Sequence, residues 1–131
     1  MQTTARRILI AEDAQVIGQV LQRNLEQEGF EVVVARNGND ALEALSTELF
    51  DLVISDFQMP GLNGDELCRH IRASERHANV PIALCTAKAY EFDIDELRAE
   101  LGIARVFEKP FSVREVMAFA HTTIEPTCAS V

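Results

Sequence analysis

The chain has few cysteines, few basic residues and no long apolar run. The three cysteines, Cys68, Cys85 and Cys128, are odd in number and match no zinc-binding spacing, so we expect a reducing, cytoplasmic compartment. No apolar stretch approaches the roughly 18 residues that span a bilayer. The charged residues of segment 1–7 are not followed by the apolar region of a signal peptide. We therefore expect no membrane partner.

The charge balance argues against one class of partner. Lysine and arginine total 12 against 21 acidic residues, which gives a net charge of -9. Proteins that bind nucleic acid directly carry a basic patch, so direct nucleic-acid binding is not expected. With 131 residues, the chain is long enough for one domain with a core that needs no disulfide. We predict a single domain over 1–131, with its core at about 7–124 and a frayed tail at 125–131.

Short apolar runs alternate with helical patterns five times along the chain. The runs are rich in β-branched residues, as is typical of buried parallel strands, and they cover 8–11, 32–35, 52–55, 82–85 and 104–108. The first helix carries an amphipathic stripe of Val16, Ile17, Val20, Leu21 and Leu25. Gly29 and Gly102 end the first and fourth helices. The pattern predicts a flavodoxin-like (βα)5 fold of the α/β class, a doubly wound parallel sheet with strand order 2-1-3-4-5.

Polar residues follow four of the predicted strands. Glu12 and Asp13 follow the first, Asp56 the third, Thr86 the fourth and Lys109 the fifth. In open α/β sheets, ligands bind beyond the carboxyl ends of the strands, where the strand order reverses. Those four strands are neighbours in the predicted order, so we expect the five side chains to share one pocket.

The charges of this pocket predict a metal site. Three carboxylates face a single lysine, and like charges 4 Å apart repel by about 4 kcal/mol at an effective dielectric constant of 20. Such a cluster either takes up a proton or binds a cation. Oxygen ligands with room for water suit Mg²⁺. We predict Asp13 and Asp56 as direct ligands, Glu12 as a direct or water-mediated ligand, and the backbone carbonyl of Gln58 as a further ligand.

The same pocket suits phosphoryl transfer to a carboxylate. Asp56 is the expected nucleophile, since aspartyl-phosphate intermediates are known chemistry. Mg²⁺ and Lys109 would stabilise the charge of the transferred group, and the Thr86 hydroxyl would donate to one of its oxygens. Simpler roles exist for each residue taken alone. Asp13 is a suitable helix N-cap, Asp56 a turn residue, Thr86 a strand residue and Lys109 a solvated surface residue.

Four segments, taken together, resemble the receiver domain of two-component response regulators. They are 8–13 with the acidic pair, 52–64 with Asp-x-x-Met-Pro-Gly, 81–87 with Thr-Ala, and 106–111 with Lys-Pro-Phe. Their order and separations match the family over about residues 7–124. The resemblance implies Asp56 as phosphoacceptor, Glu12 and Asp13 in the metal site, Thr86 and Lys109 at the phosphoryl group, and a cis peptide bond between Lys109 and Pro110.

The resemblance also implies partners. A sensor histidine kinase or a histidine phosphotransfer protein would supply the phosphoryl group, and the chain would catalyse only its own phosphorylation and slow dephosphorylation. A downstream protein or a fused output domain would be contacted through the face of the fourth helix, fifth strand and fifth helix. A homodimer through that face is compatible with the sequence. The chain is therefore expected to be a phosphorelay switch and not an enzyme acting on other substrates.

One position departs from the family pattern. Receivers commonly hold an aromatic residue three positions before the lysine, where this chain has Val106. Phe107 is adjacent, but on a strand it points to the opposite face, and Tyr90 is a candidate substitute. Two alternatives stay open: a receiver-like binding module with atypical output, and a phosphatase of the haloacid-dehalogenase type. Gln58 disfavours the phosphatase, since those enzymes usually carry a second aspartate there.

The histidines and two cysteines are predicted to have no chemical role. His70, His77 and His121 are scattered along the chain and are interpreted as surface residues. Cys68 and Cys85 lie in apolar surroundings and are interpreted as core thiols.

Overall fold

The structure, a computed structural model, describes residues 4–87, 91–124 and 127–128. Its main sheet is parallel, in the order β3-β2-β4-β5-β6, with strands β2 (Arg7–Ala11), β3 (Glu31–Ala35), β4 (Leu52–Asp56), β5 (Ile82–Thr86) and β6 (Arg105–Glu108). The helices between and after these strands are α1 (Gln15–Gln27), α2 (Gly38–Thr47), α3 (Gly64–Ala73), α4 (Glu91–Leu101) and α5 (Val113–Thr123). Counted along the chain, the parallel strands have the order 2-1-3-4-5, so the predicted flavodoxin-like fold is confirmed.

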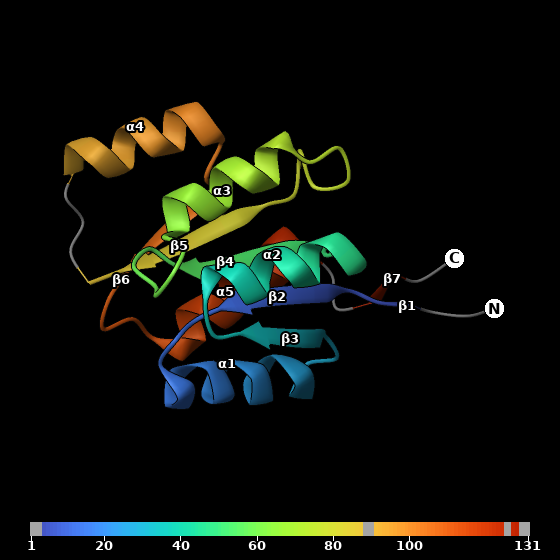
Figure 1. Cartoon of the computed structure of the whole chain (residues 1–131). Helices are drawn as coiled ribbons and strands as arrows, with labels where there is room; N and C mark the ends of the chain where they lie inside the picture. Colours follow the sequence, from blue (N-terminus) through green and yellow to red (C-terminus); the bar gives the residue numbers. More distant parts are fainter. Residues whose placement is uncertain (1–3, 88–90, 125–126, 129–131) are drawn as a thin grey trace.

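Helices cover both faces of the sheet: α1 and α5 lie on one, and α2, α3 and α4 on the other (Figure 1). Successive side chains on a strand point to opposite faces, so each central strand supplies two separate cores. On β2, Ile8 and Ile10 pack with α1 and α5. Leu9 and Ala11 of the same strand pack with the three helices on the other face. This burial on both sides explains the unbroken apolar runs of the sequence.

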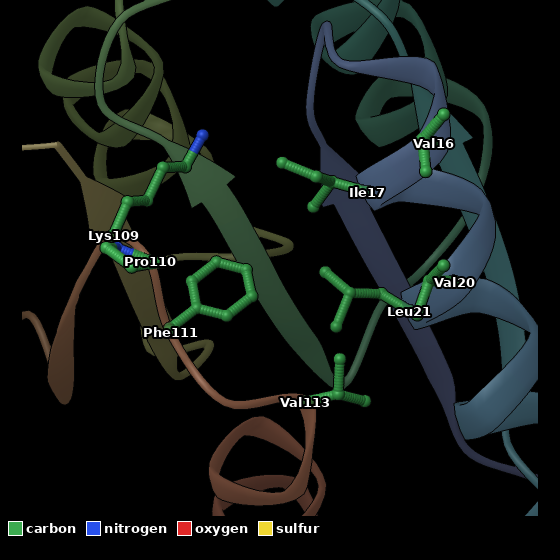
Figure 2. Close-up of a pocket in the computed structure, with 8 residues that line it drawn as sticks. All are labelled: Val16, Ile17, Val20, Leu21, Lys109, Pro110, Phe111 and Val113. Atoms are coloured by element: carbon green, nitrogen blue, oxygen red, sulfur yellow. The ribbon is translucent and has the colours of Figure 1, made fainter.

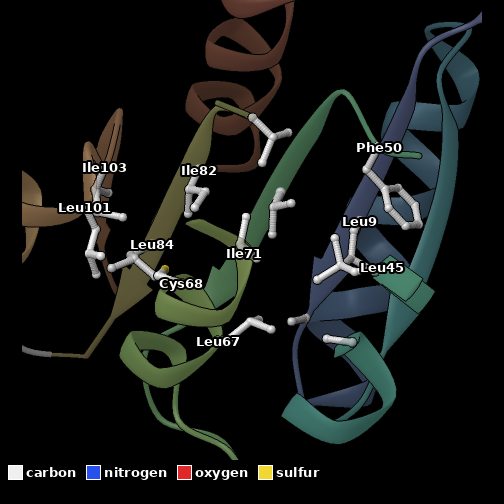
Figure 3. Packing of buried hydrophobic residues seen from close by; sticks show 14 of the residues in the cluster. Leu9, Leu45, Phe50, Leu67, Cys68, Ile71, Ile82, Leu84, Leu101 and Ile103 are labelled. Carbon is white, nitrogen blue, oxygen red and sulfur yellow. The ribbon is translucent and has the colours of Figure 1, made fainter. Parts of the chain in front are cut away.

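The larger core lies under α2, α3 and α4 (Figure 3). Strand residues Leu9, Ile82 and Leu84 meet Leu67 and Ile71 of α3 there, and each of these five side chains is at most 1% exposed. Free thiols are part of both cores, since Cys68 packs in this one and Cys85 in the other. Burial raises the pKa of each thiol to about 12, so both stay protonated, and their interpretation as core thiols is confirmed.

The first and fourth helices end at the glycines predicted from the sequence, but the predicted apolar stripe of α1 is only partly buried. Gly29 and Gly102 follow their helices with φ of 100° and 65°, a conformation that glycine adopts without steric cost. In α1, Leu21 and Leu25 are buried, whereas Val16 is 72% and Val20 40% exposed. The apolar stripe of α1 is thus wider than the core beneath it. No helix within the described ranges is both long and apolar enough to cross a membrane.

A second, two-stranded sheet was not predicted. Strand β1 (Thr4–Ala5) pairs antiparallel with β7 (Thr127–Cys128), so these two short segments lie side by side (Figure 1). The frayed tail expected at 125–131 is therefore wrong for 127–128, and its other residues lie outside the described ones. Strands of two residues carry no periodic pattern, and their pairing joins opposite ends of the chain. Sequence periodicity therefore gives no signal for them.

Charged and polar side chains bind backbone groups at the amino ends of the strands. The Arg72 guanidinium donates to the carbonyl oxygens of Val80 at 2.7 Å and Leu101 at 2.6 Å, and also to those of Ala78 and Gly102, both at 3.2 Å. This one side chain of α3 thereby fixes the loop before β5 and the C-terminal end of α4.

His77 corrects a prediction, because it is not a surface residue. Its side chain is 2% exposed, and its Nε2 accepts a hydrogen bond from the Phe50 backbone N–H at 3.1 Å. Burial lowers its pKa, so the ring is neutral and carries its proton on Nδ1. A single histidine within a loop gives no burial pattern, whereas His70 and His121 are exposed as predicted.

Candidate functional site

The strand register brings the predicted polar residues to one edge of the sheet. Ala11 of β2 is level with Ser55 of β4, so Glu12 and Asp56 leave neighbouring strands at the same height. On the other side of β4, Asp56 is level with Cys85, so Thr86 follows one position later. Thr86 in turn is level with Glu108 of β6. Lys109 therefore lies one residue beyond the strand, at the same edge.

Three carboxylates converge there. One oxygen each from Glu12, Asp13 and Asp56 lies within 4.8 Å of the others. Glu12 and Asp56 are only 3% and 8% exposed, whereas Asp13 is exposed. We call these three residues the acidic cluster. The acidic cluster thus consists of two buried carboxylates and one solvent-facing carboxylate, and its solvent-accessible side is that of Asp13.

Lys109 closes the buried side of the acidic cluster. Its Nζ lies 3.1 Å from Glu12 Oε1 and 3.1 Å from Asp56 Oδ1. The second oxygen of Glu12, Oε2, accepts from the Ala14 backbone N–H at 3.1 Å. Both oxygens of Glu12 are therefore engaged by the protein. Asp13, in contrast, does not cap α1, because the N-cap residue is Ala14, so the simpler role considered for Asp13 is wrong.

The electrostatics of the acidic cluster are unfavourable without a further cation. Desolvation and the neighbouring charge of Glu12 raise the pKa of Asp56 to about 6, although the hydrogen bond and charge of Lys109 act in the opposite direction. Desolvation by itself would lower the pKa of Lys109, but its hydrogen bonds to Glu12 and Asp56 raise that pKa overall. Lys109 is thus charged at neutral pH and Asp56 is mostly ionised. One lysine does not compensate three carboxylates.

The loop at residues 57–63, which we call the site loop, forms one wall of an open cleft beside the acidic cluster. This cleft has a volume of about 530 Å³ and is lined by Asp13, Phe57, Gln58, Met59, Pro60, Asn63 and Asp65. Gln58, whose carbonyl is a predicted ligand, therefore lines the same cleft as Asp13. The sequence reading did not identify Asn63 and Asp65 as part of this cleft. Asn63 is the N-cap residue of α3, and Glu66 of that helix accepts a hydrogen bond from the Asn63 backbone N–H.

An apolar groove adjoins the site on its other side (Figure 2). It has a volume of about 450 Å³ and is lined by Val16, Ile17, Val20, Leu21, Lys109, Pro110, Phe111 and Val113. Figure 2 shows side chains of α1 facing Phe111 and Val113 across the groove, with Lys109 at its upper end. The stem of Lys109 lines this apolar groove while its amine binds the acidic cluster. The Lys109-Pro110 peptide bond is cis, as predicted.

The strand residues near the site face opposite sides of the sheet. Thr86 is 5% exposed at the end of β5. Val106 is half-buried and packs against the core of α2, α3 and α4. Phe107 is buried in the other core, where its ring contacts Phe111 and Phe119 at centroid distances of 6.1 and 5.8 Å. The predicted opposite orientation of Val106 and Phe107 is confirmed. Tyr90, the candidate substitute aromatic, lies outside the described residues.

Comparison with known proteins gives one consistent family. A model of the response regulator receiver domain matches residues 8–121. The non-phosphorylated HemR receiver domain of Leptospira biflexa is 29% identical, with a TM-score of 0.83 over 96% of this chain and 99% of its own. The receiver domain of a Pseudomonas aeruginosa sensor histidine kinase, with magnesium in its active-site cleft, is 28% identical, with a TM-score of 0.80 over 92% and 98%. The Thermotoga maritima response regulator TrrA, in complex with Mg²⁺-BeF, is 29% identical, with a TM-score of 0.77 over 91% and 99%.

Proposed function

Because this chain belongs to the response regulator receiver domain family, we propose that it is a phosphorylation-activated switch of a two-component phosphorelay. Asp56 accepts a phosphoryl group from a phosphohistidine in a Mg²⁺-dependent reaction. The observation that carries the proposal is the convergence of three carboxylates within 4.8 Å beside a lysine amine 3.1 Å from two of them. Relatives with magnesium or Mg²⁺-BeF support it.

The acidic cluster fits Mg²⁺. All its donors are hard carboxylate oxygens, and the open side at Asp13 leaves room for the waters that Mg²⁺ retains. Asp13 and Asp56 would be the direct ligands, together with the Gln58 carbonyl. Glu12 would act through water, since Lys109 and the Ala14 N–H already occupy its two oxygens. Bound Mg²⁺ would supply positive charge that admits the anionic phosphoryl group and stabilises it during transfer.

The chain's own residues account for the remaining chemistry. With a pKa of about 6, Asp56 is mainly ionised at pH 7, and its carboxylate oxygen attacks the phosphorus. The phosphorus–nitrogen bond of the donor breaks, and its electron pair leaves with the imidazole. Lys109 stays beside Asp56 and stabilises the charge on the phosphoryl oxygens. The Thr86 hydroxyl at the next strand end donates to one of these oxygens.

The switch would act through the loops that follow β4 and β5. A phosphoryl group adds about -1.5 to -2 charges at pH 7 and three acceptor oxygens. This added charge would change the hydrogen bonds and ion pairs around Asp56, Thr86 and Lys109. Val106 has no ring to reorient, so the signal would reach partners without the usual aromatic residue. A downstream protein or fused output domain would read the face of α4, β6 and α5, which also suits a homodimer. A receiver-like module with atypical output remains the second candidate, on the evidence of Val106.

We further propose that the phosphohistidine donor docks in the apolar groove. A sensor histidine kinase or phosphotransfer protein must bring its histidine to Asp56, and the groove shares Lys109 with the site. Val16 is 72% exposed there, which suits an apolar partner surface. Val16→Asp should slow transfer from a protein donor at least tenfold and leave phosphorylation by acetyl phosphate unchanged. Equal rates of transfer from the protein donor to Val16→Asp and to the wild type would refute docking at this groove.

The chain would catalyse only its own phosphorylation and slow dephosphorylation, would work in the cytoplasm and would not bind nucleic acid directly. Its net charge of -9 supports the last point, since phosphate backbones require a basic surface.

Intact mass spectrometry tests the central proposal. We expect one phosphoryl adduct after incubation with acetyl phosphate and Mg²⁺, and none with a chelator or in Asp56→Ala. Asp65→Ala is the matched control, because Asp65 lines the cleft outside the acidic cluster. An unmodified wild-type mass with several small phosphodonors would favour a binding module that has lost phosphorylation.

A further inference from the structure

Helix α2 contributes no side chain to the acidic cluster, yet its first residue touches the loop beside it. We infer that Gly38 is a positioning residue for phosphorylation. Because Gly38 has no side chain, α2 can pack closely against the site loop and hold it in the position beside the acidic cluster that Mg²⁺ and phosphoryl binding require. The inference rests on the proposed function for its chemical consequence. The packing on which it depends is independent of that function.

The contact between α2 and the site loop leaves no space for a methyl group. A Cβ on Gly38 would lie 2.3 Å from Leu62 Cβ, 2.5 Å from Leu62 O and 3.0 Å from Leu62 C. Two of these three atoms belong to the backbone, so rotation of a flexible side chain does not relieve the overlap. Since contacts below about 3.4 Å are already tight, the loop or the helix would have to move by about 1 Å.

The opposite side of the site loop is equally constrained. A Cβ on Gly64, the first residue of α3, would lie 2.5 Å from Asp56 O and 2.8 Å from Phe57 Cα. The Gly64 N–H also donates to Phe57 O at 2.8 Å. Displacement at Leu62 is therefore not absorbed at Gly64. It is passed along the loop to Gln58 and Asp56, which lie at the site.

Gly38→Ala is the direct test, and Gly18→Ala is its matched control. Both glycines lie in helices, where alanine is intrinsically favoured over glycine. The Gly18 Cβ would meet only Val34 Cγ1, at 3.2 Å, which is a side-chain atom in the core of α1 and α5, on the other face of the sheet from Leu62. We expect Gly38→Ala to bind Mg²⁺ at least tenfold more weakly than wild type, measured by calorimetry. Gly18→Ala should stay within twofold of wild type.

Hydrogen exchange without metal separates positioning from chemistry. In metal-free Gly38→Ala, we expect the Gly64 and Leu62 amides to exchange at least tenfold faster than in wild type, while β2 and β4 amides keep their protection. Should Gly38→Ala fail to fold, Leu62→Gly, which removes the Cβ atom against which Gly38 packs, should change Mg²⁺ affinity and loop exchange in the same directions. Wild-type exchange and affinity in Gly38→Ala would overturn the inference, as would equal losses in Gly18→Ala. Failure of the wild type to bind Mg²⁺ would instead count against the proposed function, and the metal-free exchange experiment would still decide the role of Gly38.

Discussion

The two ends of the parallel sheet use charged side chains in opposite ways. At the carboxyl ends, Glu12, Asp56 and Lys109 face one another, and burial raises the pKa of Asp56 to about 6. At the amino ends, Asp51 accepts from the Arg7 backbone N–H at 2.8 Å, and Arg72 donates to several backbone carbonyls. One end therefore holds a charge imbalance, and the other holds completed backbone hydrogen bonds.

The difference has a physical basis. Buried charges stabilise a fold when they satisfy backbone groups that would otherwise lack partners. They destabilise it when like charges are held together away from water. The backbone groups at the amino ends of the strands need hydrogen-bond partners, whereas the carboxyl ends need affinity for a cation and an anion. Substitutions at the two ends should therefore change stability with opposite signs.

The largest expected effect is that of Asp56→Asn. This variant should take up no phosphoryl group, and its metal-free form at pH 7 should be more stable than wild type by up to about 3 kcal/mol. Desolvation and the charge of Glu12 raise the pKa of Asp56 from 3.8 to about 6, and each pKa unit corresponds to 1.36 kcal/mol. Urea unfolding and intact mass measure both effects. Asp13→Asn, at an exposed position, should gain less, and a loss of stability in Asp56→Asn would contradict the comparison.

At the amino ends, Arg72→Met should destabilise the protein by about 2–4 kcal/mol, because several partly buried carbonyls lose a charged donor. The variant should still accept phosphate from acetyl phosphate, since Arg72 lies at the end of the sheet opposite the site. Arg69→Met is the control. It breaks the exposed ion pair with Glu100, and such pairs contribute little. Equal losses of stability in both variants, measured by urea unfolding, would show that the hydrogen bonds of Arg72 to carbonyl groups do not stabilise the fold.

Magnesium should compensate the excess negative charge of the acidic cluster and leave the amino ends of the strands unchanged. At ten times its dissociation constant, Mg²⁺ should stabilise the wild type by about 1.4 kcal/mol at pH 7. Arg72→Met should gain the same increment, because its site is unchanged. At pH 5 the gain should shrink, since the pKa of Asp56 is about 6 and a protonated carboxyl is a poor ligand. Thermal shift at the two pH values measures the gain, and a pH-independent gain would mean that Asp56 is not a ligand.

The pH dependence of stability should have opposite signs at the two ends of the sheet. The folded state raises the pKa of Asp56, so it binds more protons than the unfolded state, and stability falls as pH rises from about 4 to 6. In contrast, the folded state lowers the pKa of His77. At this residue the folded state therefore binds fewer protons than the unfolded state, and stability falls as pH drops below about 6.5.

Unfolding measured from pH 4.5 to 7.5 in single variants separates these two slopes. Asp56→Asn should keep only the loss at low pH. His77→Gln, whose amide oxygen can still accept from the Phe50 N–H, should keep only the loss towards neutral pH. If both variants showed the wild-type profile, neither residue would control it.

The sequence predicted much of the site because its residues lie next to strong patterns. Glu12, Asp56 and Lys109 each follow an apolar strand, and the strand order follows from five alternating units, so their convergence could be inferred. The burial of His77, the donors of Arg72 and the β1–β7 pairing could not. Each depends on a loop or chain end meeting a residue distant in sequence, and such contacts leave no periodic signal.

The sequence alone determined the architecture and the chemistry available at one edge of the sheet. Alternating apolar runs and helical stripes permit few ways of burying both faces of parallel strands. Only the tertiary structure decided how that chemistry is held: Lys109 between two carboxylates, Glu12 with both oxygens engaged, and α2 against the site loop. These are matters of ångström-scale distance between segments far apart in the chain, and side-chain packing, not local preference, sets such distances.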